Sequence, residues 1–140
     1  MVRRMETADL NAVAAIWLDT NLKAHAFIPS QYWKRNYEAV KGMLENAEVY
    51  VWEDGKGIQG FVGLDRDYIA GIFVRDGEQS RGIGRELLDF AKGLRSVLSL
   101  NVYQKNSRAV RFYRGEGFEI RSESVDGNTG EPEYLMEWRH

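Results

Sequence analysis

The stretch that decides the fold covers residues 68–88, which read YIAGIFVRDGEQSRGIGRELL. Its first part, Tyr68 to Arg75, is a nearly continuous apolar run, which predicts a strand covered on both faces. A polar loop follows, and Gly82-Ile83-Gly84 then opens an amphipathic helix that is predicted to end at Leu94. Glycines let an anion approach the backbone, and free N–H groups at a helix N-terminus attract negative charge. The stretch therefore predicts a strand–loop–helix unit that suits a pyrophosphate.

Two better-known phosphate motifs do not fit this loop. The dinucleotide-binding fingerprint fails because Leu87 stands where a third glycine is required. The nucleotide P-loop fails because the chain contains no Gly-Lys-Ser or Gly-Lys-Thr. Taken alone, a loop with two glycines before a helix is as often a simple turn as a phosphate site.

Periodicity outward from this unit predicts the order β-α-α-β-β-β-α-β-α-β-β, a mixed sheet flanked by helices in the α/β or α+β class. Strands are expected over 2–5, 48–53, 58–64, 68–75, 97–103, 118–122 and 134–138. Helices are expected over 82–94 and 107–116, and after the N-caps Thr7 and Ser30. Residues 20–29 read as a loop. The prediction is thus about seven strands and four helices.

Composition limits the possible functions. The 140 residues are 44% hydrophobic, which predicts one folded domain over residues 1–140. The absence of cysteine excludes disulfides, thiolate catalysis and cysteine zinc sites. A net charge of −2 gives no global attraction to nucleic acid or anionic membrane. No apolar run is long enough to span a membrane, and the start of the chain lacks a signal core, so a cytoplasmic location is expected.

A second segment adds the decisive motif. Asn106 follows a predicted strand, Tyr113 lies seven residues later on the next helix, and Gly117-Phe118 follows. Together with Gln79, Gly82 and Gly84, these residues resemble the signatures of the GNAT superfamily of acetyl-CoA-dependent N-acetyltransferases. The similarity extends along essentially the whole chain, and it is greatest to small stand-alone bacterial members regarded as protein-lysine or general N-acetyltransferases.

The resemblance implies a GNAT-like, mostly antiparallel sheet and a site for acetyl-CoA. The backbone of the central strand would bond the pantetheine arm, and backbone amides of the loop would hold the pyrophosphate. The cofactor-binding residues so implied are Ile72, Phe73, Val74, Gln79, Ser80, Arg81, Gly82, Ile83, Gly84 and Asn106. The side chains of the three strand residues can equally be core, and Asn106 can equally cap the following helix. Ser80 stands where the family often has glycine.

Tyr113 is the predicted catalytic residue, because a phenol near the thioester can protonate the departing thiolate. Adjacent helix residues face different ways, so Phe112 is expected in the core. Some family members use a glutamate in the strand before the asparagine as a base, but Asn101 stands at that position here. Tyr68, Asp65 and Asp67 are other candidates for relaying or accepting the proton of the amine.

The acceptor side is expected near the loop 23–30. His25 and Phe27 could contact the substrate there, and His25 could accept a proton near neutral pH, although a loop histidine more often faces solvent. Tyr68 is the third candidate substrate residue. No set of side chains has the spacing of metal ligands, so no metal is expected.

The predicted function is acetyl transfer from acetyl-CoA to a primary amine by direct attack in a ternary complex, with a protein lysine as the first-choice acceptor. A small-molecule amine acetyltransferase and a non-catalytic acyl-CoA-binding module are the alternatives. Acetylation of charged tRNA is disfavoured by the near-neutral charge. The expected partners are acetyl-CoA and the amine acceptor, with no nucleic acid and no membrane, in a monomer or homodimer.

Overall fold

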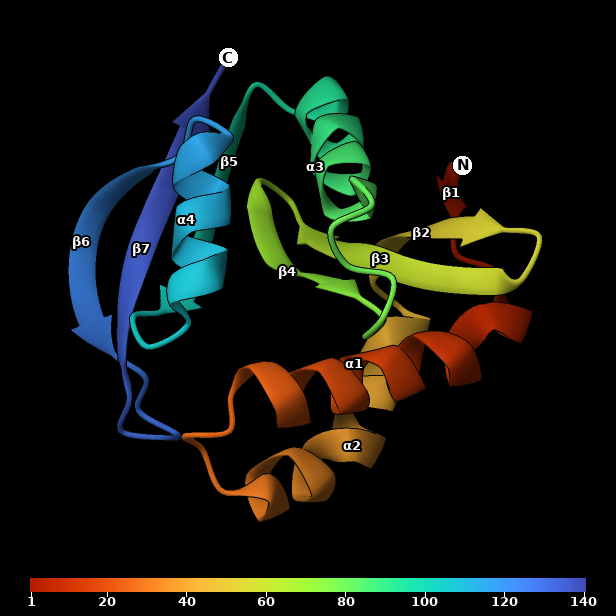
Figure 1. Ribbon diagram of the computed structural model, residues 1–140, viewed down its shortest axis with the longest axis horizontal. Helices are drawn as coiled ribbons and strands as arrows, with labels where there is room; N and C mark the ends of the chain where they lie inside the picture. The colour runs from red at the N-terminus through yellow and green to blue at the C-terminus, as the bar shows by residue number, and fades with distance from the viewer.

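The computed structural model describes residues 1–140 and contains seven strands, four α-helices and one 3-10 helix (Figure 1). The strands are β1 (Val2–Arg4), β2 (Glu48–Asp54), β3 (Gly57–Asp65), β4 (Tyr68–Val74), β5 (Val97–Tyr103), β6 (Glu119–Val125) and β7 (Pro132–Arg139). The helices are η1 (Thr7–Asp9), α1 (Leu10–Ala24), α2 (Ser30–Glu45), α3 (Ile83–Leu94) and α4 (Ser107–Gly115). The element order confirms the predicted fold class.

All seven strands form one sheet in the order β1-β2-β3-β4-β5-β7-β6. Every neighbouring pair is antiparallel except β4 and β5, which are parallel and pair only at Tyr68 opposite Ser99. Beyond that pair the two strands diverge, so that β5, β7 and β6 turn away from β2, β3 and β4 (Figure 1). The edge of β4 that faces β5 therefore has no strand partner over most of its length.

Helices cover the two faces of the sheet and create two cores. Helix α1 covers one face of β2 and β3, and α3 covers the opposite face of β3, β4 and β5 (Figure 1). The core under α1 includes Val13, Ala14, Ile16, Val49, Val51 and Phe61. The core under α3 includes Val62, Leu64, Ile69, Leu87, Leu88, Ala91, Leu98 and Leu100. Alternate residues of β3 thus serve different cores, as the two-residue period of a strand requires.

Strand β4 is less covered than its apolar sequence predicts. Of its residues only Ile69 is buried, while Ile72, Phe73 and Val74 are half-buried. The expectation of a strand covered on both faces was wrong for this end, because β5 diverges and leaves these residues beside a cavity.

The ends of the first two helices also differ from the prediction. Thr7 lies inside the 3-10 turn and is not an N-cap, and the Asp9 carboxylate accepts the backbone N–H of Glu6 at 2.8 Å. Helix α1 continues to Ala24, so half of the expected loop 20–29 is helical. Pro29 holds the N-cap position of α2, and Ser30 is the first helical residue.

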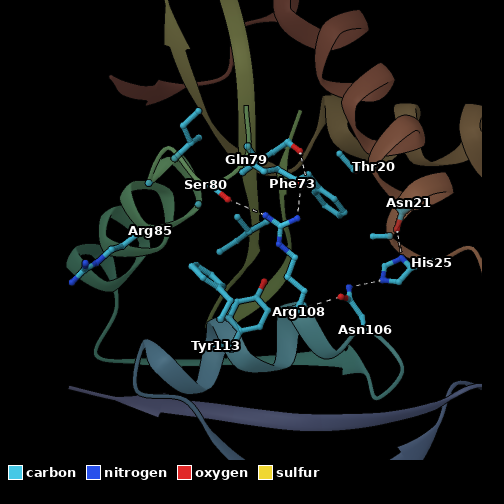
Figure 2. A pocket seen from close by; sticks show the side chains of 18 residues that line it. Thr20, Asn21, His25, Phe73, Gln79, Ser80, Arg85, Asn106, Arg108 and Tyr113 are labelled. Carbon is cyan, nitrogen blue, oxygen red and sulfur yellow. Dashed lines mark hydrogen bonds between the residues drawn. The ribbon is translucent and has the colours of Figure 1, made fainter. Parts of the chain in front are cut away.

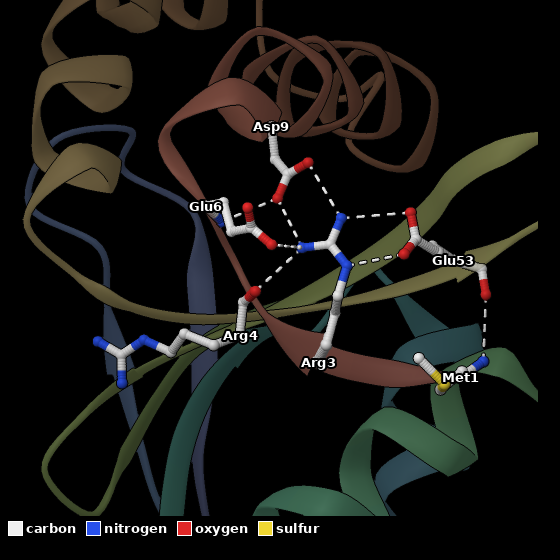
Figure 3. Close-up of polar contacts among 6 residues, drawn as sticks. All are labelled: Met1, Arg3, Arg4, Glu6, Asp9 and Glu53. Atoms are coloured by element: carbon white, nitrogen blue, oxygen red, sulfur yellow. Dashed lines mark hydrogen bonds and ion pairs between the residues drawn. The ribbon is translucent and has the colours of Figure 1, made fainter.

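Arg3 ties the first strand to its surroundings (Figure 3). Its guanidinium donates to the Asp9 carboxylate at 2.8 and 3.1 Å and to the Glu53 carboxylate at 2.7 and 3.2 Å. The Arg3 guanidinium also holds the pKa of both carboxyl groups below their usual range. One half-buried side chain thereby joins β1 to the start of α1 and to the end of β2.

None of the helices is both long and apolar enough to traverse a lipid bilayer.

Candidate active site

A cavity of about 430 Å³ lies where β4 and β5 diverge (Figure 2). Its walls come from the last turns of α1, the second half of β4, the loop before α3 with the start of that helix, and one side of α4. The loop and the start of α3 lie opposite α4, so the cavity separates the two motifs found in the sequence. No carboxylate lines it, whereas Arg85 and Arg108 do.

The loop before α3 presents backbone donors to this cavity. The N–H groups of residues 79–85 donate to no acceptor in the protein, and those of 83–85 lie in the first turn of α3, which has no side-chain cap. Gly82 adopts a left-handed φ of 81° and Ser80 one of 70°, and these conformations curve the loop. Such a run of unpaired N–H groups at a helix N-terminus is a binding site for a phosphate or diphosphate.

The open edge of β4 supplies a second kind of contact. Strand β3 pairs with one edge of β4, and beyond Tyr68 the other edge faces the cavity. Backbone groups along Ile72, Phe73 and Val74 are therefore available to a ligand that carries amide groups. The Val74 carbonyl already accepts the side-chain amide of Gln79 at 3.3 Å.

The structure distinguishes among the arginines that the sequence could not rank. Arg108 reaches from α4 across the cavity and donates to Gln79 Oε1 at 2.7 Å and to Ser80 Oγ at 3.3 Å (Figure 2). Both of these partners are neutral. Arg85 instead lies 3.6 Å from a Glu116 carboxylate oxygen, and Arg81 turns away from the cavity and pairs with Glu78. Of the expected loop residues, only Arg81 does not line the cavity.

Tyr113 lies on the inner face of α4, where its side chain is 8% exposed. Its ring makes edge contacts with Phe112 and Phe118 at centroid distances of 5.2 and 5.6 Å. Burial raises the pKa of the phenol well above its ordinary value, and no hydrogen bond contributes to that shift. Phe112 also lines the cavity, so the expectation that it would face only the core was wrong.

Asn106 and His25 meet at the other end of the cavity. Asn106 caps α4, since its Oδ1 accepts the backbone N–H of Ala109 at 3.2 Å. Its Nδ2 lies 3.1 Å from His25 Nε2. Burial lowers the pKa of His25 to about 4. The imidazole is therefore neutral near pH 7, with its Nε2 facing an amide nitrogen and not solvent.

The other candidate substrate residues lie outside the cavity lining. Tyr68 donates to Asn101 Oδ1 at 2.7 Å, and burial raises the pKa of its phenol. The ring of Phe27 packs against His25 and Tyr103. Asp65 pairs with Arg66 and Asp67 lies 3.7 Å from Arg95, so neither carboxylate reaches the cavity.

Two residues that the sequence reading missed line the cavity from α1. Thr20 and Asn21 are buried polar residues, and their side chains bond to backbone carbonyls one turn earlier. Their helical spacing from Trp17 and His25 could have indicated that they share a face of α1. The expectation of a loop over 20–29 excluded that interpretation.

The donor set as a whole fits acetyl-CoA. The unpaired N–H groups and Arg108 suit its diphosphate, the β4 edge suits its amide-bearing arm, and the apolar side chains of Ile72, Val74 and Phe112 suit its methylene groups.

Comparison with known proteins finds acetyltransferases by sequence. Residues 45–120 match the family described as "Acetyltransferase (GNAT) domain". The chain is 33% identical over 140 residues to "Peptidyl-lysine N-acetyltransferase YiaC" of Escherichia coli K12, a match that covers 99% of this chain and 96% of that one.

Solved structures show the same fold. The solution structure of apo-form YjaB from Escherichia coli has a TM-score of 0.88 and 25% identity, covering 99% of this chain and 96% of that one. The structure of yncA from Salmonella typhimurium with its cofactor acetyl-CoA has a TM-score of 0.68 at 19% identity, over 99% and 92% of the two chains, a likeness of fold alone.

The family match spans more than half of the chain, and the relationship to YiaC extends over almost all of it. Both agree with the two motifs on either side of the cavity. The chain therefore belongs to the GNAT family of N-acetyltransferases, which use acetyl-CoA as co-substrate.

Proposed function

We propose that this chain transfers the acetyl group of acetyl-CoA directly to the side-chain amine of a lysine in a protein. The observation that carries the proposal is the cavity in which the 79–85 amides, the open edge of β4 and Tyr113 come together. The choice of lysine is supported by relatives named peptidyl-lysine N-acetyltransferase, YiaC and YjaB.

In this proposal the donor is held at three places. Backbone N–H groups of Gln79 to Gly84 bind the diphosphate, and Arg108 exchanges its neutral partners for the phosphate charge. Backbone groups of residues 72–74 bond the pantetheine arm, as an added strand would. Asn106 retains one N–H and one lone pair for the same arm.

Tyr113 is the proposed general acid. When bound, acetyl-CoA supplies a thioester whose carbonyl carbon is attacked by the amine and whose C–S bond then breaks. The raised pKa of the phenol keeps Tyr113 protonated until its hydroxyl donates that proton to the departing sulfur. The attacking nitrogen then releases one proton, which restores the phenol and leaves the neutral amide. The amine must arrive without its own proton, because a protonated amine has no lone pair.

Direct transfer is favoured over a covalent intermediate. The chain has no cysteine that could carry the acetyl group as a thioester. Ser80 is the one hydroxyl of the 79–84 loop, and no histidine or carboxylate bonds to it as an activating base.

Both acidic and basic side chains lie near the expected acceptor loop, where Lys105 Nζ is 5.5 Å from the centre of the Phe27 ring. On β5, Tyr103 faces away from the core that holds Leu100 and Val102, and it pairs with Glu133 of β7. Its hydroxyl donates to Asp126 Oδ2 at 2.6 Å. Burial and the nearby Asp126 raise the pKa of the Glu133 carboxyl.

The test combines binding with product analysis. Calorimetric titration with acetyl-CoA is followed by mass spectrometry of lysine peptides and of a polyamine incubated with the enzyme and donor. Gly84→Trp places an indole between Val74 and Phe112, whose side chains lie 3.8 and 3.6 Å from a Cβ at this position, so binding should be lost. Tyr113→Phe should retain binding and lower kcat by roughly 10²–10⁴-fold. Tyr37→Phe, on α2 away from the cavity, is the matched control.

Each alternative gives a different result. Binding without acetylation of any amine would identify a non-catalytic module, and acetylation of the polyamine alone would identify a small-amine enzyme. A Tyr113→Phe enzyme as fast as the Tyr37→Phe control would remove the general-acid role. Absence of donor binding would overturn the proposal.

A further inference from the structure

His25 ends helix α1 with its ring enclosed by aromatic side chains. The ring stacks on Trp33 at a centroid distance of 5.6 Å and makes edge contacts with Tyr103 at 5.0 Å and Phe27 at 5.6 Å. The two ring nitrogens are the only polar atoms of this side chain. Each has one partner: Nδ1 lies 2.8 Å from Asn21 Oδ1, and Nε2 lies 3.1 Å from Asn106 Nδ2.

Asn21, His25 and Asn106 thus form a hydrogen-bonded relay, and the direction of each of its bonds is fixed from both ends. On the α1 side, the Trp17 carbonyl can only accept, so Asn21 donates through Nδ2 at 2.9 Å and presents Oδ1 to the ring. On the α4 side, the Ala109 N–H can only donate, so Asn106 accepts through Oδ1 and presents Nδ2 to the ring. His25 must therefore donate through Nδ1 and accept through Nε2.

This assignment leaves the imidazole neutral and gives it a defined tautomer. A protonated ring would place an N–H against the amide N–H groups of Asn106. Rotating the Asn106 amide to relieve that clash would turn its nitrogen toward the Ala109 N–H and break the cap of α4. The relay is thus consistent with one protonation state only, and it spans the cavity from α1 to α4 (Figure 2).

We propose that His25 is a positioning residue, which holds the side-chain amide of Asn106 in place in the cavity and links it to the loop between α1 and α2. The proposal rests on the proposed function for the role of Asn106 toward the donor. It assigns His25 neither proton transfer nor substrate contact, since both nitrogens are already bonded within the protein.

The ring contacts extend the relay toward the acceptor side. Trp33 belongs to α2, Phe27 to the loop between α1 and α2, and Tyr103 to the end of β5. A side chain that packs on all three and bonds to Asn106 connects the two sides of the cavity. Removing its nitrogens while keeping its shape should therefore disturb the donor site and leave the aromatic cluster intact.

The first measurement uses the protein without ligand. Nitrogen-15 NMR of the imidazole is expected to show the Nδ1–H tautomer of His25, still neutral at about pH 5. His140→Phe removes the only other histidine and so leaves a single imidazole to assign. A His25 ring that is in the other tautomer, or that is protonated by pH 6, would overturn the relay whatever the chain catalyses.

The second measurement is kinetic. His25→Phe keeps an aromatic ring but leaves Asn21 Oδ1 and Asn106 Nδ2 unpaired, and it should lower kcat/KM for acetyl-CoA about tenfold. His25→Gln, whose amide can accept from Asn106, should recover part of that loss. The same substitution at the chain's other histidine, His140→Phe, should change kcat/KM by less than about twofold.

A double-mutant cycle separates positioning from a general structural effect. Asn106→Ser retains an oxygen to cap α4 but has no N–H for His25. In that background, adding His25→Phe should cost less than about twofold, because the relay is already broken. If the losses in kcat/KM caused by Asn106→Ser and His25→Phe multiply in the double variant, the positioning role is contradicted. Acetylation by the wild type would in that case still support the proposed function. A wild-type enzyme without acetylation would instead refute the proposed function itself.

Discussion

Arg108 differs from its neighbours in having no acidic partner. Arg81 is neutralised by Glu78 and Arg85 lies beside Glu116, whereas Arg108 crosses the cavity to two neutral side chains. A cation held by neutral groups can change partners when a phosphate arrives, since no ion pair has to break. Arg108 is therefore the side chain whose charge we expect to be used in binding the donor.

Arg108→Gln should weaken acetyl-CoA binding about tenfold and make the dissociation constant less dependent on salt. Calorimetry at two salt concentrations measures both effects. Arg111→Gln, three residues along α4 and also exposed, removes the same charge away from the cavity and serves as the control. Equal losses in the two variants would show that Arg108 acts through general charge alone.

Tyr113, the proposed general acid, is expected to set the alkaline limit of the reaction. Burial raises the pKa of its phenol, so the protonated, proton-donating form persists to a higher pH than for an ordinary tyrosine. No carboxylate lines the cavity to take the proton of the amine, and a free lysine has a pKa of about 10.4. The reactive neutral amine therefore becomes about tenfold more abundant with each pH unit.

We expect the logarithm of kcat/KM for a lysine peptide to rise with a slope near one between about pH 7 and 9. We expect no decline in kcat/KM at any pH up to about 10. Steady-state rates across this range measure the slope. Tyr113→Phe should keep the slope at a lower level. A decline with a midpoint near pH 8 would mean that another group, with a lower pKa, supplies the proton.

Individual residues were predictable where a motif fixes their spacing. Gln79, Gly82, Gly84, Asn106 and Tyr113 were named from the sequence, and all line one cavity. Arg108 could not be ranked, because its distinction depends on which neighbouring arginines find carboxylates in three dimensions. For His25, the sequence shows a histidine near a loop but not the two amides that bond to its nitrogens.

Strand β4 contributes both to the core and to the cavity, and a close contact between its alternate residues Gly71 and Phe73 is part of this arrangement. A Cβ atom at Gly71 would lie 2.4 Å from the ring of Phe73, which packs on Phe61 and lines the cavity. The glycine is needed here for space, since its φ is not positive. On the neighbouring strand, Gly63 pairs directly with Gly71, and a Cβ there would meet only Ala70 at 3.8 Å.

Gly71→Ala should therefore displace the Phe73 ring, destabilise the protein by about 1–3 kcal/mol and weaken acetyl-CoA binding. Gly63→Ala, its partner in the register, should cost less than about 1 kcal/mol and leave binding unchanged. Chemical denaturation and calorimetry of the pair make the comparison. Unchanged binding in Gly71→Ala would show that the position of the Phe73 ring does not matter to the donor.

At the scale of elements, the order of strands and helices was predictable, but several boundaries were not. The chain has no glycine or proline between Leu10 and Pro29, so nothing in the sequence breaks α1 before residue 20. The side chains of Thr20 and Asn21 bond to carbonyls of their own helix and so remain compatible with it. The divergence of β4 from β5 left no signal in the sequence, since both strands are apolar whether or not they pair.

For the molecule as a whole, His25 links the relay to acid stability. Its pKa of about 4 in the folded protein lies below the usual 6.5, so the unfolded chain binds the proton more readily between these values. The free energy of unfolding is therefore highest above about pH 6.5 and falls as the pH drops toward 4, by at most about 3 kcal/mol. Carboxyl groups with lowered pKa values, such as Asp9, add their own loss below that range.

His25→Phe has no imidazole to protonate, so its unfolding free energy should be nearly flat across this range, while His140→Phe should follow the wild type. Urea unfolding at about pH 7 and pH 5 gives the two differences. Parallel pH dependence in wild type and His25→Phe would place the acid-sensitive group elsewhere.

The divergence of β4 and β5 also bears on the resistance of the folded protein to unfolding and proteolysis. One pair of residues, Tyr68 and Ser99, joins β4 to β5. A donor that bonds, as proposed, to β4 and to the start of α3 and α4 would bind only when both halves of the sheet are folded together. At a concentration one hundred times its dissociation constant, such a ligand adds about 2.7 kcal/mol to the free energy of unfolding. Backbone amides then exchange more slowly with solvent, and proteases find fewer opened chains. We therefore expect the purified protein to resist proteolysis longer as acetyl-CoA is added, even when no acceptor is present.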